Sequence, residues 1–244
     1  MKGVIANVTT THSLYTPEGP LQLDLEKIAN EHRDTFGFSH NPRLSMPAIK
    51  INIECKPYFK KINVAIYASG SVVQTGAPSP EQARLAAHMF ARTSLRHLGI
   101  CNAQVRDFKV RNIVATVQGK GPVDLMGLQR LLGQQRCDYK HPQDPLRQKS
   151  GYSAAIVKSS VDTKIKILIY DTAHCVMMGT KSRDAVSHVI QEIQWMIEET
   201  KKSIQALGFP VSKTVRMDSM LRLANQTIHQ RLQDGRAPRS TKKK

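Results

Sequence analysis

Apolar residues alternate with polar ones along several short stretches of this chain, and each such stretch predicts a β-strand with one buried face. The isoleucines of 49–53 follow the pattern, and the apolar residues of 62–66 repeat it. β-Branched residues over 2–11 predict a strand at the start of the chain. In the second half, strands are predicted over 152–159 and 163–170.

Helical spacing of apolar residues appears between these strands. It predicts a first helix over 23–33. Ser79 is expected to cap a second, longer helix whose first turn contains a proline and which ends at Gly99. Corresponding helices are predicted to begin at 123–125 and after Ser182.

The chain contains an internal repeat. Residues 66–77 read as two short strands joined at a Ser-Gly turn, and residues 169–180 form a second, degraded copy. The distance from Tyr67 to Tyr170 is 103 positions, and Gly76 and Gly179 are separated by the same number. A constant offset over a whole segment indicates a duplication.

Each half is predicted to have the order β-α-β-β-β-α, which favours an α+β fold with one antiparallel sheet and helices on one face. The expected boundaries are 1–101 for the first repeat and 102–208 for the second. Residues 209–235 carry one apolar helical stripe and are expected to form a helical extension that docks on the body. The basic tail 236–244 is expected to be disordered.

The net charge of +17 over 244 residues favours an anionic partner, with nucleic acid ahead of a membrane. We expect no membrane span and, from four scattered cysteines, an intracellular protein. No paired carboxylates, nucleophile with a base, or metal-ligand spacing stands out, so we expect neither an enzyme nor a cofactor.

The strand face opposite the helices is also largely apolar, yet the sequence supplies helices for only one side of the sheet. An uncovered apolar face on a basic chain indicates a partner that is anionic outside and apolar within. An opened DNA minor groove meets this description. The alternative is that the face packs on a second subunit or on the C-terminal helix.

Three motifs of the chain resemble those of a known family. Tyr-Ala-Ser-Gly-x-x-Val-x-Thr-Gly-Ala at 67–77, Gln-x-x-Leu-Ala-Ala at 82–87 and Asp-Phe-Lys-Val-Arg-Asn-Ile-Val-Ala at 107–115 are similar to the TATA-box-binding protein core. The resemblance covers about 2–207 and suggests a divergent member, with a viral or an archaeal-like origin as alternatives. It implies a saddle of ten antiparallel strands, with four helices on the convex face and DNA on the concave face.

The resemblance and the strand faces together predict a set of DNA contacts. These are Ile5, Asn7, Met46, Asn52, Ala65, Tyr67, Ser71, Val73, Thr75, Asn112, Val114, Tyr152, Lys158, Leu168, Tyr170, His174, Val176 and Lys181.

Four of these residues stand where the family has aromatic wedges that enter base steps. Tyr67 and Tyr170 take the hairpin positions. Tyr152 takes the third position, and Met46 the fourth, with Leu44 as the alternative register. An apolar Met or Leu can serve as a wedge.

The resemblance implies polar contacts of Asn112 and Thr75 with A·T pairs at the centre of the DNA site. Their counterparts in this reading are Gly3 and Met178, and Asn7, taken to share the strand face of Gly3, is the expected substitute. Fewer polar contacts in one half should weaken sequence preference, because the minor groove distinguishes little beyond A·T from G·C.

Phosphate contacts are implied for basic residues of the family. Lys158 and Lys181 match such positions, whereas Asn52, Ser71 and His174 replace basic residues.

The implied function is that of an initiation factor. It would bind and bend A·T-rich promoter DNA and nucleate preinitiation complex assembly with general transcription factors or RNA polymerase components. The loop 141–149, where the family is acidic, keeps only Asp144 and gains Arg147 and Lys149, which indicates a partner of its own. The expected place is the nucleus or a site of viral transcription, or the cytoplasm for an archaeal protein.

Three further possibilities accompany this reading. The saddle face could mediate self-association when DNA is absent. The chain could be a protein-interaction platform with weak or nonspecific DNA binding, or a nonspecific binder that depends on its basic tail.

Overall fold

The computed structural model describes residues 1–32, 39–40, 47–56, 59–139 and 154–206. The first half contains β1 Gly3–Thr16, β2 Gly19–Pro20, α1 Leu25–Glu31, β3 Ser39–His40, β4 Ala48–Cys55, β5 Phe59–Tyr67, β6 Ser71–Ala77, α2 Pro80–Met89, the π-helical turn η1 Phe90–Ser94 and α3 Leu95–His97. The second half contains β7 Gln104–Gln118, α4 Leu125–Leu132, β8 Cys137–Asp138, β9 Ala154–Lys158, β10 Lys166–Tyr170, β11 His174–Thr180 and α5 Arg183–Ala206.

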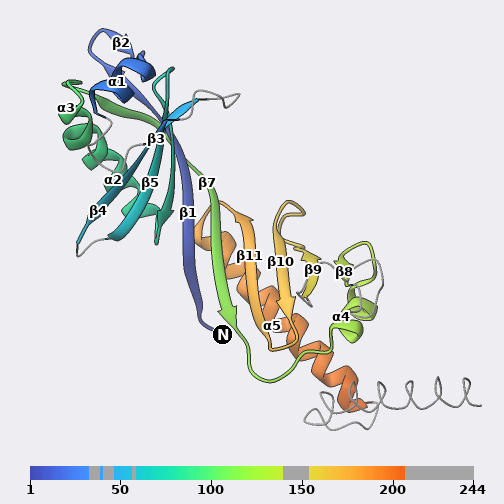
Figure 1. The fold of residues 1–244 in the computed structure, drawn as a ribbon. Helices are drawn as coiled ribbons and strands as arrows, with labels where there is room; N and C mark the ends of the chain where they lie inside the picture. Colours follow the sequence, from blue (N-terminus) through green and yellow to red (C-terminus); the bar gives the residue numbers. More distant parts are fainter. Residues whose placement is uncertain (33–38, 41–46, 57–58, 140–153, 207–244) are drawn as a thin grey trace, which may run out of the picture.

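The described strands form one antiparallel sheet in which β1 and β7 lie side by side at the centre (Figure 1). The order is β3-β4-β5-β6-β1-β7-β11-β10-β9-β8, and the short β2 pairs only with β1. The ten strands along this order confirm the predicted saddle sheet. β3 and β8, with two residues each, form its ends.

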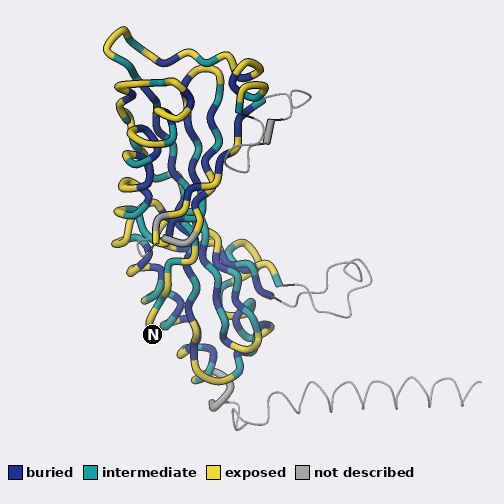
Figure 2. Tube along the Cα trace, turned by 60° about the vertical axis from the view of Figure 1, so that its left-hand side comes forward, coloured by how far each residue is buried: buried dark blue, intermediate teal, exposed yellow. Residues whose placement is uncertain are grey.

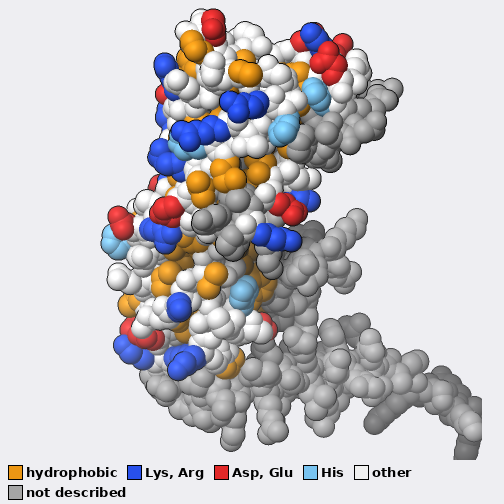
Figure 3. Space-filling model, turned by 90° about the vertical axis from the view of Figure 1, so that its left-hand side faces the viewer, with side chains coloured by type: hydrophobic (Ala, Val, Ile, Leu, Met, Phe, Trp, Pro, Cys, Tyr) orange, Lys and Arg blue, Asp and Glu red, His pale blue; other side chains and the backbone are white. Residues whose placement is uncertain are grey.

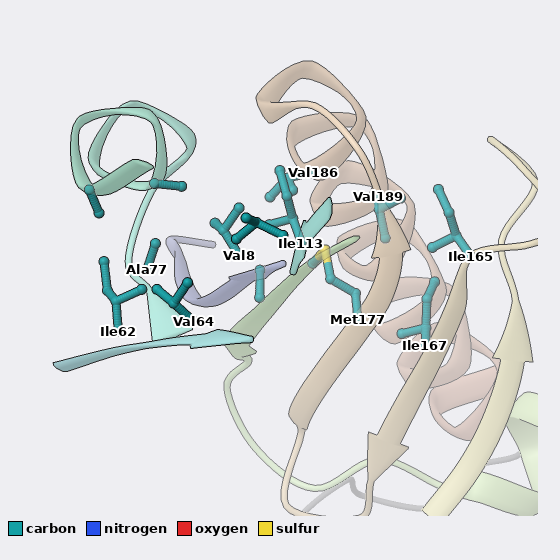
Figure 4. Packing of buried hydrophobic residues seen from close by; sticks show 14 of the residues in the cluster. Val8, Ile62, Val64, Ala77, Ile113, Ile165, Ile167, Met177, Val186 and Val189 are labelled. Carbon is teal, nitrogen blue, oxygen red and sulfur yellow. The ribbon is translucent and has the colours of Figure 1, made fainter. Parts of the chain in front are cut away.

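Helices cover one face of this sheet. α2 contacts β1, β6 and β7, and α5 contacts β7 and β11. The strands turn apolar side chains toward them, and Figure 4 shows Val8, Ile113 and Met177 in this core. The alternation of buried and less buried residues along the strands is visible in Figure 2. The period-2 pattern of the sequence therefore produces a core between the helices and one sheet face.

The helix starts agree with the capping signals of the sequence. Ser79 accepts a hydrogen bond from the backbone N–H of Gln82, and Pro80 is the first residue of α2. The predicted helix continues toward Gly99 through η1 and α3, although the sequence does not predict the π-helical turn. None of the described helices is long and apolar enough to cross a membrane.

The repeat is visible in matching backbone hydrogen bonds. The N–H of Leu14 donates to Gly70, and the N–H of Gly119 donates to Ala173 in the same way. Both acceptor residues adopt a positive φ at the hairpin turn, +71° for Gly70 and +60° for Ala173. Because both turns share this conformation, the degraded second hairpin keeps the geometry of the first.

Two one-residue bulges fix how β1 and β7 correspond. On β1 the pairing passes from Ile5 opposite Ala115 to Asn7 opposite Val114, which leaves Ala6 unpaired. On β7 Arg111 is left out in the same manner. The two bulges are 105 positions apart, so β1 and β7 are related by this offset.

The predicted match of the strand at Gly3 with the strand at Asn112 is therefore wrong. Asn112 corresponds to Asn7, which lies 105 positions earlier. Gly3 lies on the helix side, where a Cβ atom would meet Ile190 of α5. The unpaired residue of the bulge turns Gly3 and Asn7 to opposite faces, which a strictly alternating strand would not do.

Other predicted features are adjusted or lie elsewhere. The first strand extends to Thr16 rather than 11, since β1 continues into a hairpin with β2 that has no counterpart among the described residues of the second half. The first helix ends at Glu31 rather than 33. The helical extension 209–235, the tail 236–244 and the loop 141–149 lie outside the described residues.

Candidate nucleic-acid interface

The sheet face opposite the helices carries no described helix, and most of its side chains are exposed or partly exposed, with Ala48 and Ala154 buried. The strand register defines this concave face. Its residues are Asn7, Thr9 and Thr11 of β1, Ala48, Lys50, Asn52 and Glu54 of β4, Lys61, Asn63, Ala65 and Tyr67 of β5, Ser71, Val73 and Thr75 of β6, Asn112, Val114 and Thr116 of β7, His174, Val176 and Met178 of β11, Lys166, Leu168 and Tyr170 of β10, and Ala154, Ile156 and Lys158 of β9.

Two asparagines near the centre have identical hydrogen bonds. Asn7 Oδ1 accepts from the backbone N–H of Gly76 at 2.7 Å, and Asn112 Oδ1 accepts from that of Gly179, also at 2.7 Å. Both glycines have a positive φ, +102° and +100°. Glycine is suited to these positions because a side chain there is strained.

These bonds determine how each amide is turned. A backbone N–H can only donate, so the atom that faces it must be the amide oxygen. The NH₂ group of Asn7 and that of Asn112 then point away from their glycines, and neither has a partner among the described residues. The concave face thus offers two equivalent pairs of N–H donors near its centre.

This arrangement changes one prediction about the centre. Asn7 is not a substitute for a missing residue at Gly3, because it is itself the counterpart of Asn112. The loss of polar contacts in the first half is therefore wrong for the asparagine position. The other asymmetry, Thr75 against Met178, is present on the concave face.

Ile5 is the predicted contact that the structure places on the other face. It pairs with buried Ala115 and packs partly buried against the core under the helices. The bulge at Ala6 explains the error, because it shifts the alternation by one residue. Thr9, which pairs with Asn112, lies on the concave face and is the counterpart of Val114 at the offset of 105.

Tyr67 and Tyr170 lie at equivalent places on the concave face. Ala48 pairs with Tyr67, and Ala154 pairs with Tyr170. The Tyr170 ring lies 5.8 Å from the ring of His174, measured between centroids. Both tyrosines are partly exposed. The other two predicted wedges, Met46 and Tyr152, and the alternative Leu44, lie outside the described residues.

Most of the remaining predicted contacts share the concave face. They are Asn52, Ala65, Ser71, Val73, Val114, Lys158, Leu168, His174 and Val176. His174 also lies 3.3 Å, Nδ1 to Oε1, from Gln118. Lys181 is exposed just after β11, and the register does not bring it to this face.

Several residues of this face were not predicted as contacts. Among them are Thr9, Thr11, Lys50, Asn63, Thr116, Ile156 and Lys166. The strict alternation of residues 49–53 and 62–66 would have identified Lys50 and Asn63. Thr11 accepts a hydrogen bond from Arg111 Nε at 2.8 Å, which holds the guanidinium of the bulge residue beside β1.

Positive charge is not confined to the concave face. Figure 3 shows the side of α2 and α3, where Lys and Arg side chains gather over the first repeat. Arg84 there lies 4.5 Å from the ring centroid of Phe108. This positive charge favours attraction of an anionic partner. The concave face differs from the helix side in that it presents half-exposed apolar and amide groups. No group of residues suited to a metal ion occurs in the described part of the chain.

Comparison with known proteins gives consistent matches. The family model for Transcription factor TFIID (or TATA-binding protein, TBP) matches residues 3–96 and again 107–200. TATA-box-binding protein 1 of Triticum aestivum is 30% identical over 202 residues, which are 83% of this chain and 76% of that protein. The TATA-box-binding protein of Acanthamoeba castellanii is 31% identical over 182 residues, 75% of this chain and 63% of that protein.

A solved structure shows the same fold. The match to Methanococcus jannaschii TBP has a TM-score of 0.61 at 22% sequence identity, and it covers 82% of this chain and 99% of that one.

Proposed function

The chain belongs to the TATA-binding protein family, a family of DNA-binding transcription factors, and we propose that it binds the minor groove of A·T-rich promoter DNA on its concave face and bends it. In this role it nucleates a transcription initiation complex, with general transcription factors or polymerase components as partners, at the site of transcription. Family membership agrees with the expectation that the chain is not an enzyme.

The observation that carries this proposal is the pair of asparagines held by glycine N–H groups. In each, the NH₂ group points away from the glycine and has no partner among the described residues, and the two lie at equivalent places in the repeats. The minor groove floor of A·T pairs carries only acceptors, adenine N3 and thymine O2. The two NH₂ groups near the centre of the concave face are therefore complementary to the centre of an A·T-rich site.

The surroundings of the asparagines supply the rest of the surface. Val73, Val114, Val176 and Leu168 offer apolar contacts to the sugars and base edges of an opened groove. Tyr67 and Tyr170 stand at the two ends as wedges between base steps, a geometry for which this family is itself the standard example. Unstacking a step costs a few kcal/mol, which the larger contact with bent DNA offsets.

The test removes the NH₂ donors of the two asparagines. Asn7→Asp and Asn112→Asp keep an oxygen for the glycine N–H but remove the NH₂ donors. Asn30→Asp makes the same charge change on α1, and serves as the matched control. Affinity is measured by fluorescence anisotropy on A·T-rich and G·C-rich duplexes over a salt series, and bending by energy transfer between the duplex ends.

We expect the unmodified chain to prefer and bend the A·T-rich duplex. Each of the two concave-face variants should lower A·T affinity by roughly tenfold or more, with Asn30→Asp near the unmodified value. A Tyr67→Ala, Tyr170→Ala double variant should lose bending. Equal affinity for both duplexes with a steep salt dependence would instead identify a nonspecific binder. Absence of binding to either duplex would leave a protein-interaction platform.

A further inference from the structure

The two repeats carry different chemistry on equivalent parts of the concave face. Ala48 and Ala154 both pair with the wedge tyrosines, so β4 and β9 correspond at an offset of 106 positions. Two residues further on, Lys50 of the first repeat corresponds to Ile156 of the second. On β6 and β11, Thr75 corresponds to Met178.

A cross-strand pair differs in the same sense. Asn52 pairs with Asn63 across β4 and β5, whereas the equivalent pair across β9 and β10 is Lys158 with Lys166. Ala65, which is adjacent to these residues, corresponds to the larger Leu168. The first repeat therefore has amides where the second has ammonium groups, and it has polar Lys50 and Thr75 where the second has apolar Ile156 and Met178.

The polar groups of the first repeat surround one hollow. Its volume is about 470 Å³, and Lys50, Asn52, Lys61, Asn63 and Thr75 contribute to its lining. Lys50, Asn52, Lys61 and Asn63 are exposed, and Thr75 is partly exposed. The hollow offers both donors, from the lysines and amides, and acceptors, from the hydroxyl and amide oxygens.

The two repeats differ in whether they offer a hydrogen-bond acceptor to guanine in the minor groove. A G·C pair places the guanine N2 amino group, a donor, on the minor groove floor beside the acceptors that A·T pairs also have. In the first repeat the oxygens of Thr75 and Asn63 can accept from such a group. Against Ile156, Leu168 and Met178 the same group would lose its water without gaining an acceptor, which is costly.

We propose that the two repeats read different half-sites: the first repeat accepts G·C pairs, and the second requires A·T pairs. The inference rests on the proposed binding of duplex DNA by the concave face. It follows that the protein binds a mixed duplex in one orientation, with the first repeat over the G·C half.

The first measurement compares three labelled duplexes of equal length, with A·T pairs in both halves, G·C pairs in one half, or G·C pairs in both. Replacing one half should raise Kd less than about threefold, because the protein turns its first repeat to that half. Replacing both should raise Kd more than tenfold, as each unmatched base pair commonly costs about that much.

Orientation is measured with a cleavage reagent attached to a cysteine in the hairpin turn of either repeat. Ser69→Cys and Thr172→Cys form a matched pair, since both residues are exposed and are 103 positions apart. Cys101, which is exposed, is replaced by serine in both. On the half-substituted duplex, Ser69→Cys should cleave the G·C end and Thr172→Cys the A·T end.

A Lys50→Ile, Thr75→Met variant gives the first repeat two of the residues of the second. Both positions are at least partly exposed, and an unchanged thermal melt verifies the fold. This variant should lose tolerance for G·C, so that one substituted half now costs about tenfold.

The outcomes separate this inference from the proposed function. If the A·T duplex is preferred and bent, but one substituted half costs as much as both or each reagent cleaves both ends equally, the half-site inference is wrong and the proposed function stands. If the A·T duplex is neither preferred nor bent, the proposed function fails, and this inference fails with it.

Discussion

A buried polar cluster in the first repeat should make the protein sensitive to mild acid. Thr10, His12 and Gln74 lie on the helix side of the sheet under α2, and all three side chains are buried. Their counterparts in the second repeat are the apolar Ala115, Val117 and Met177. His12 is 2% exposed and stacks on Phe108 with ring centroids 6.2 Å apart.

The imidazole of His12 has little to stabilise a positive charge. Neither of its ring nitrogens has a hydrogen-bond partner among the described residues. Burial and, to a smaller extent, the nearby charge of His88 lower the pKa of His12 to about 4. Arg84 lies over the ring of Phe108, on which His12 stacks, and adds further positive charge close by.

The pKa of His12 differs between the unfolded and the folded chain, and this difference makes stability fall as the pH falls. The unfolded chain protonates His12 near its ordinary pKa of 6.5, whereas the folded chain resists protonation until about pH 4. The stability that depends on neutral His12 is therefore fully present above pH 6.5 and is lost as the pH falls toward 4. Between pH 7 and pH 5 the loss is about 2 kcal/mol, and it approaches about 3 kcal/mol below pH 4.

Urea denaturation at pH 7 and pH 5 tests this prediction. Unfolding should be followed by far-UV circular dichroism, because Trp195 lies in the other repeat. His12→Val, which installs the residue type of Val117, should remove about 2 kcal/mol of the pH dependence whatever its stability at pH 7. If the variant loses as much stability between pH 7 and pH 5 as the unmodified chain, the account of His12 is refuted.

Three further predictions concern the second repeat. Gly179→Ala should lower the unfolding free energy in urea denaturation by about 3 kcal/mol, because φ is +100° there and a Cβ atom would lie 2.8 Å from a backbone oxygen. Gly133→Ala is the control: φ is +75° and the space is open, so the loss should be only about 1 kcal/mol. Glu192→Ala removes the acceptor of an ion pair of 2.6 Å and of two serine hydroxyls, and should destabilise by about 3 kcal/mol in chemical denaturation; an unchanged midpoint would contradict this. Replacing Lys158 and Lys166 by Gln should reduce the slope of log affinity against log salt by about 0.9 for each lysine that contacts a phosphate, and an unchanged slope would show that neither does.

Much of the fold is predictable from the sequence because its signals are local. The hairpins show alternation and a shared turn, and Ser79 with Pro80 marks the start of α2. The duplication then supplies the architecture, in which the two halves join through the equivalent strands β1 and β7. The period-2 pattern also places most of the predicted contacts, such as Val73 and Leu168, on one face without any knowledge of their partners.

The errors at the central strand come from a single unpaired residue. Ala6 carries no side-chain signal for a bulge, and a bulge is a property of strand pairing rather than of the strand alone. Without it, Ile5 and Gly3 read as concave-face positions, and Asn7 reads as a replacement. The hydrogen bond from Gly76 to Asn7 spans 69 positions, so no local pattern could reveal it.

The symmetry of this protein is best defined by those long-range hydrogen bonds. The offset between the repeats varies along the chain, being 103 at the hairpins, 105 at the central strands and 106 at the outer strands. What stays constant is the unit formed by a bulge, a positive-φ glycine and an asparagine, which occurs once in each repeat. Its two asparagines place equal donors at the centre, while Lys50 and Thr75 differ from Ile156 and Met178 further out. Symmetric donors cannot distinguish the two orientations of a duplex, so we attribute the proposed choice of orientation to the outer positions at which the repeats differ.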